Sequence, residues 1–182
     1  MFSQLRPALT LIGAFSAVLG LGYPLAITGI AQAVMPAQAN GSLIARDGVT
    51  LGSALIGQRF TRPEYLHPRP SAVDYDAANS GGSNLGPSSA ELLAQVRDRA
   101  AAFDAPPAPS DMATASASGL DPHISRAAAL AQVPRIAAAR GLDESAIRAA
   151  IDAATTGPAF GFVGDPIVNV LQTNLALDAA GA

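Results

Sequence analysis

The chain has 182 residues and a mass of 18.3 kDa, and its eleven basic residues, all arginine, face fourteen acidic ones for a net charge of −3. Lysine and cysteine are absent, which excludes Walker A phosphate loops, protein-kinase catalysis, lysine Schiff bases, thiolate nucleophiles and disulfides. The negative net charge is atypical of a nucleic-acid-binding surface, so no nucleic-acid partner is expected.

A long uncharged segment separates Arg6 from Arg46. Within it, the low-polarity stretch 8–34 would form a helix of roughly 40 Å, enough to cross a hydrocarbon core of about 30 Å. Pro24 is expected to kink that helix. We therefore predict a short N-terminal tail over 1–7, a transmembrane helix over 8–34 that contacts membrane lipid, and a soluble domain over 36–182.

The same segment also fits a cleaved signal peptide, with Arg6 as the basic region, 9–21 as the apolar region and Ala37–Ala39 as the cleavage motif. We favour the retained anchor, because the apolar stretch is about twice as long as an ordinary signal-peptide core. Arg6 lies on the short N-terminal side, and the next basic residue is Arg46. The positive-inside rule then favours a cytoplasmic N-terminus and a periplasmic soluble domain.

The first half of the soluble domain contains a hairpin, an irregular region and a helix. Residues 42–46 and 49–51 flank Asp47-Gly48, a favoured two-residue turn, and predict a β-hairpin. Prolines and glycines over 60–87 preclude long regular elements, and a run of this length is usually functional or disordered. A capping box at Ser88 then predicts a helix to about Phe103.

The second half alternates short helices and strands. Asp121 and Pro122 are expected to start a helix that ends near Gln132. The other expected elements are a linker over 104–110, a short strand over 112–116, a helix between Pro134 and Gly141, a helix over 143–154, a strand over 167–170 and a short helix to Asp178. Helices and strands mixed in this way predict an α+β fold.

A loop rich in Gly and Ser is the first candidate site, and it consists of Ser80, Gly81, Gly82, Ser83 and Asn84. Its backbone amides could cradle an anion or a nucleotide phosphate. Arg69 is its only nearby cation, and no lysine completes a phosphate site. On residue type alone, a tight surface loop is the simpler interpretation.

Catalytic and metal sites are not expected. Ser118, Asp121, His123 and Ser125 include the residue types of a hydrolytic triad, but a triad is a spatial arrangement and the predicted helix start already explains Asp121. His67 lies far from His123 in the sequence, so a histidine-based metal site is not expected either. We predict no catalytic residue and no metal ligand.

Several longer strings follow one another along the chain: Gly22–Leu25 with Thr28–Gly29, Gln38–Ser42, Leu55–Gln58, Arg69–Ala72, Tyr75, Ser80–Pro87, Gly119–Ser125, and Val168–Leu171 with Asn174. This ordered set closely resembles the KdpC family, the small C subunits of the bacterial Kdp potassium-transporting ATPase, over nearly the whole chain. The chain departs from the family pattern at four positions. Ala117 stands for a usual Gly, Arg126 for Pro, Asp165 for Glu and Ile167 for Arg.

The resemblance implies a non-catalytic subunit of a multi-subunit potassium pump in the bacterial inner membrane. Its implied partners are a channel-like subunit that selects potassium and a P-type ATPase subunit that is phosphorylated on Asp. It further implies a role in assembly and as a catalytic chaperone that raises the ATP affinity of the ATPase subunit. ATP would then be bound jointly with that subunit, with Ser80–Asn84 as the nucleotide loop. The P-type phosphorylation motif contains Lys, which this chain lacks.

The two assisting roles require the soluble domain to lie on opposite sides of the membrane. A domain outside the cytoplasm cannot touch cytoplasmic ATP, and would instead act as a cap that governs ion access. Glu64, Asp74 and Asp76 could then raise the local potassium concentration. A domain inside the cytoplasm would keep the nucleotide role. An anchored external binding module without a pump is a further alternative.

Overall fold

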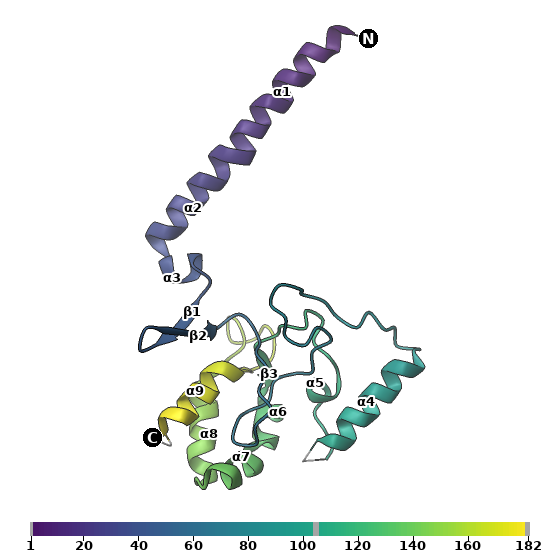
Figure 1. Cartoon of the computed structure of the whole chain (residues 1–182), viewed down its shortest axis with the longest axis vertical. Coiled ribbons are helices and arrows are strands. Elements are labelled where there is room, and N and C mark those ends of the chain that lie inside the picture. The colour runs from purple at the N-terminus through teal and green to yellow at the C-terminus, as the bar shows by residue number, and fades with distance from the viewer. Residues whose placement is uncertain (1, 104–105, 181–182) are drawn as a thin grey trace. The chain divides into compact units, whose positions relative to one another are not determined.

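The computed structural model describes residues 2–103 and 106–180, and the chain divides into two compact units, Met1–Leu43 and Ile44–Ala182. Figure 1 shows a helical first unit and a second unit of mixed helices and strands. The predicted fold class, one apolar N-terminal helix followed by an α+β region, is confirmed.

The first unit is helical almost throughout. Its elements are η1 Phe2–Gln4, α1 Leu5–Ala17, η2 Val18–Gly22, α2 Tyr23–Val34 and α3 Pro36–Ala39. The helical span Leu5–Val34 is 30 residues long with a mean hydropathy of 1.7, and among the described residues it is the one helix long and apolar enough to cross a membrane. The helix continues through Pro24, and the wider π-helical turn η2 ends two residues before that proline.

The predicted hairpin is confirmed in β1 Leu43–Arg46 and β2 Val49–Ser53, which pair as a two-stranded sheet. Its turn residues Asp47 and Gly48 have φ of 53° and 78°. Positive φ at both positions is what a type I′ turn requires, which is why Asp-Gly is a reliable hairpin signal.

A second sheet of three antiparallel strands lies among the helices, in the order β3-β5-β4. β3 is His123–Ser125, β4 is Thr155–Thr156, and β5 is Ile167–Asn169. Ile124 lies opposite Val168, and both side chains are buried. The sheet therefore joins residues more than forty positions apart in the sequence.

The helices of the second unit have these bounds: α4 Ala90–Ala102, α5 Ser110–Ala113, α6 Arg126–Ala131, α7 Val133–Arg140, α8 Glu144–Ala153 and α9 Val170–Ala180. Helical spacing brings their apolar residues to one face, as with Ile147 and Ile151 on α8. Gly141 ends α7 in the left-handed conformation, with φ of 64°, and the Asp143 carboxylate caps α8. These two helices and the α9 helix confirm the predictions for the C-terminal half.

Two predictions for the middle of the domain are wrong. The region 112–116, predicted as a strand, contains the end of helix α5 and an irregular segment. Asp121 does not cap a helix: its carboxylate accepts a hydrogen bond from the His123 backbone at 3.0 Å, and strand β3 follows. Helix α6 begins only at Arg126, with Ser125 as its cap. The predicted linker includes residues 104 and 105, which lie outside the described residues.

Residues 54–89, all described, contain no helix or strand, yet side chains from the helices fix part of this segment. Leu66 inserts into the core and is fully buried. The Asn174 side chain on α9 accepts a hydrogen bond from the Leu66 N–H at 2.8 Å and donates one to its carbonyl at 3.0 Å. Gln132 binds both backbone groups of His67 in the same way, at 2.8 and 3.2 Å.

These amide contacts predict that Asn174 is worth more to stability than an exposed neighbour. Asn174→Ala leaves both backbone groups of Leu66 buried without partners, so the free energy of unfolding should fall by about 2–4 kcal/mol. Urea unfolding of the full chain in detergent measures it. The control, Gln172→Ala, changes an exposed residue on the same helix, and an equal loss in both variants would contradict the assignment.

Candidate functional site

The predicted Gly- and Ser-rich loop lies against the segment 116–119. The Gly81 N–H donates to the Ser118 carbonyl at 2.8 Å, and the Ser80 hydroxyl donates to the same oxygen at 3.1 Å. One of the loop's amides is therefore committed to the protein itself. The structure thus places the first half of the predicted loop against the backbone of residues 116–119, which follow α5.

The glycines permit this close approach. A Cβ added at Gly82 would lie 2.8 Å from the carbonyl oxygen of Ala117. Gly119, with φ of 68°, faces the loop from the other segment, and a Cβ there would lie 2.7 Å from the Gly81 carbonyl oxygen. The two backbones can lie this near because Gly82 and Gly119 carry no Cβ at the points of contact. Packing therefore accounts for Gly82 and Gly119 independently of any ligand.

Two open pockets border this contact. One of about 660 Å³ is lined by Ser80 and Arg69 among others. The second, of about 330 Å³, is lined by Gly82, Ser83 and Asn84 on one side. Both volumes fall in the range of small-molecule sites. Four of the five predicted loop residues thus line one of these two pockets, and Gly81 lines neither.

Arg69, the predicted cation, is in the wall of the larger pocket. Its Nη1 donates to the Asp121 carboxylate at 3.1 Å, and its backbone carbonyl accepts from the Tyr75 hydroxyl. Its Nε is buried without a hydrogen-bond partner. Burial raises the pKa of Tyr75, an effect that the charge of Arg59 opposes. The pocket's positive charge is therefore already balanced by Asp121.

The triad residue types do not form a charge-relay arrangement. His123 Nδ1 lies 3.7 Å from the Asp121 carboxylate, but the Ser125 hydroxyl donates to Asp111 at 3.1 Å. The Ser118 hydroxyl lies 3.1 Å from that of Ser116. Within residues 2–103 and 106–180, no three His, Cys, Asp or Glu residues come together in a way that could hold a metal ion.

The acidic residues proposed to attract potassium each have a local partner. Glu64 pairs with Arg62 at 3.1 Å, and Asp74 pairs with Arg59. The carboxylate of Asp76 accepts hydrogen bonds from Asn79 and from the Ala78 N–H, which lower its pKa. Two of the three charges are thus compensated by arginines, and the third stays ionised in moderately acidic solution.

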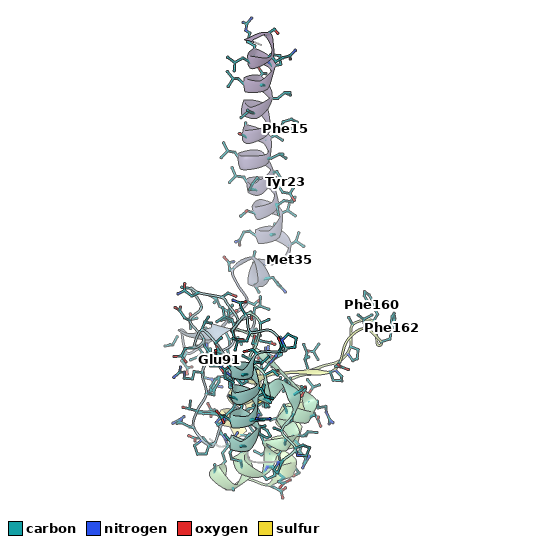
Figure 2. All side chains as sticks on the ribbon, turned by 90° about the vertical axis from the view of Figure 1, so that its right-hand side faces the viewer. Phe15, Tyr23, Met35, Glu91, Phe160 and Phe162 are labelled. Carbon is teal, nitrogen blue, oxygen red and sulfur yellow. The ribbon has the colours of Figure 1, made fainter. Side chains whose placement is uncertain are left out.

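One exposed feature was missed by the sequence reasoning. The connection between β4 and β5, residues 157–166, carries Phe160 and Phe162, which are 92% and 82% exposed. Figure 2 shows both rings on a loop that extends away from the rest of the domain. The signal available in the sequence is two phenylalanines between glycines in a stretch without charge.

Comparison with known proteins gives one family. The family model described as KdpC, K⁺-transporting ATPase, c chain, matches residues 5–179. The potassium-transporting ATPase KdpC subunit of Cereibacter sphaeroides is 58% identical, with all of both chains covered. Similar proteins of the same description are found in Caulobacter vibrioides, 54% identical over 98% of this chain and 94% of the relative, and in Methylorubrum populi, 51% identical over 98% of each.

The close backbone contact predicts unequal effects of alanine at two glycines of the same region. Gly82→Ala would place a methyl group against the Ala117 carbonyl and should lower the free energy of unfolding by about 1–3 kcal/mol. Gly86→Ala meets nothing within 4 Å and should be neutral or stabilising by up to about 1 kcal/mol. Thermal unfolding of both variants tests this, and equal melting temperatures would refute the packing role of Gly82.

Proposed function

Because this chain belongs to the KdpC family, the c chain of K⁺-transporting ATPases, we propose that it is the non-catalytic subunit that stabilises the assembled pump from outside the cytoplasm. As a member of that family it is a subunit of a potassium-uptake complex. The partners would be the channel-like potassium-binding subunit and the P-type ATPase subunit, which performs the hydrolysis.

The observation that carries the proposal is the distribution of charge around the apolar helix. The span Leu5–Val34 contains one charged residue, Arg6, near its start, and its residues are exposed throughout nearly all of its length. The family match includes this span, since it begins at residue 5. An exposed apolar helix needs lipid or other helices around it. Arg6 then favours an N-terminus inside and a domain outside the bacterial inner membrane.

Assembly through this helix is supported by its glycines. Apart from their own stretch of helix, Gly13, Gly20 and Gly29 have no atom of this chain within 4 Å of where a Cβ would lie. Small residues on a membrane helix allow a neighbouring helix to approach closely. Helices of the partner subunits would pack at these positions, and a plain lipid anchor would not need them.

A reporter fusion tests the orientation. A reporter active only in the periplasm, fused after the last residue of the full chain, should be active, and one active only in the cytoplasm should be silent. The positive-inside rule supplies the reason, with Arg6 as the inner charge. Adding arginines at Gln38 and Asn40 is the matched control and should weaken or invert the pattern. A cytoplasmic result for the natural sequence would overturn the proposed location, and with it the roles in ion access.

A role as a catalytic chaperone for ATP is the second candidate, and the pockets beside Ser80–Asn84 favour it. The loop and Arg69 line spaces of about 660 and 330 Å³, which is room for part of a nucleotide bound jointly with the ATPase subunit. The role requires the domain to lie in the cytoplasm. A periplasmic result in the fusion experiment would therefore exclude this role before any loop residue is changed.

Ser83→Asp tests the nucleotide loop directly. An added carboxylate beside a bound phosphate should raise the apparent KM for ATP of the assembled complex by roughly fivefold, corresponding to about 1 kcal/mol of repulsion. Ser88→Asp places the same charge on an exposed serine outside the loop and should leave KM unchanged. Steady-state ATPase assays measure both, and identical KM values would count against a nucleotide at this loop.

A further inference from the structure

The connection 157–166, here called the finger, has a defined backbone. Ala159 and Val163 exchange two backbone hydrogen bonds, each 2.9 Å, and so form a small antiparallel bridge. The Gly161 N–H donates to the Pro158 carbonyl at 3.0 Å inside the turn. The base of the finger is fixed as well, because β4 and β5 pair antiparallel on either side of it. The finger is therefore an ordered hairpin.

The finger presents its aromatic side chains outward. Phe160 and Phe162 are almost fully exposed, and Val163 is about half exposed. Phe160 has φ of 54° and Gly161 φ of 83°, so the tight turn holds a bulky residue in a conformation that such residues rarely adopt. Two exposed rings on such a turn do not stabilise the domain by itself. Burial of each ring against another apolar surface would be favourable, because it removes a large apolar area from water.

The charge around the finger indicates what would bury it. Residues 153–164 carry no charge, and the first charged residue after them is Asp165. The chain beyond residue 45 has ten arginines against fourteen acidic residues, a net charge of −4. An anionic lipid surface attracts basic segments, and the finger offers no basic residue to such a surface. An uncharged apolar pocket in a protein fits two ordered aromatic side chains better.

We propose that the finger inserts Phe160 and Phe162 into an apolar pocket on another subunit of the potassium-transporting ATPase. This inference rests on the proposed function, since it needs the chain to be part of the complex. Aromatic anchors in a desolvated pocket are the usual centres of protein–protein binding energy. The ordered hairpin reduces the conformational entropy lost on binding. The finger would be a second attachment point, separate from the membrane helix.

Co-purification of the complex tests the finger. The tagged chain is co-expressed with the remaining subunits, extracted in mild detergent, and the amount of each subunit retained is measured. Phe160→Ser with Phe162→Ser should reduce retention at least tenfold. Leu93→Ser, which changes an exposed leucine on α4, is the matched control and should retain the subunits as the natural chain does. Retention by the double variant equal to that of the control would overturn the inference.

A cross-linking measurement keeps the result independent of folding. A photoreactive p-benzoylphenylalanine replaces Phe162, a change that preserves an exposed aromatic ring, and the same group at Leu93 serves as the control. Cross-links from position 162 to another subunit support the proposal, whereas cross-links to lipid or to none overturn it. If the natural chain itself fails to retain any subunit, the proposed function fails instead, so the two failures are distinguishable.

Discussion

Two neutral side-chain amides hold the second unit together where it has no secondary structure. Asn174 satisfies both backbone groups of Leu66, and Gln132 does the same for the next residue. A chain without helix or strand cannot enter a core unless its N–H and C=O groups find such partners. Because Leu66 is fixed in the core, the residues that follow it place Arg69 in the wall of the larger pocket. Asn174 on α9 and Gln132 between α6 and α7 thus help to position the candidate site without lining its pockets.

Local signals were sufficient where the structure is local. The Asp47-Gly48 turn and the Asp143 cap each act within a few residues, and both were predicted correctly from the sequence. Asp121 was misassigned because an Asp before Pro can start a helix or close a short turn with its own backbone. The choice was made by the pairing of β3 with β5, more than forty residues away. A local window of the sequence contains no signal for strand pairing at that distance.

The loop 80–84 could be singled out from its composition, but the packing role of Gly82 could not. A run of glycines and serines such as 80–84 has the same appearance whether its amides hold a phosphate or its glycines admit a second backbone. The structure shows the second arrangement, since Gly82 lies against Ala117. The partner segment lies about 35 residues further on, and only the folded chain brings it there. Phe160 and Phe162 were not predicted as a surface feature, because apolar residues in a sequence suggest a core.

The side chains that bind the backbone of residues 62–67 determine how this segment responds to pH and salt. Several of the bonds to this backbone come from amide side chains and arginines; Arg140, for example, donates to the carbonyls of Glu64 and Leu177. Amides do not titrate, and guanidinium groups stay charged at all ordinary pH values. Because these arginine bonds are partly buried, salt screens them less than it would screen fully exposed ones. These contacts should therefore hold residues 62–67 in place over a wide range of pH and salt concentration.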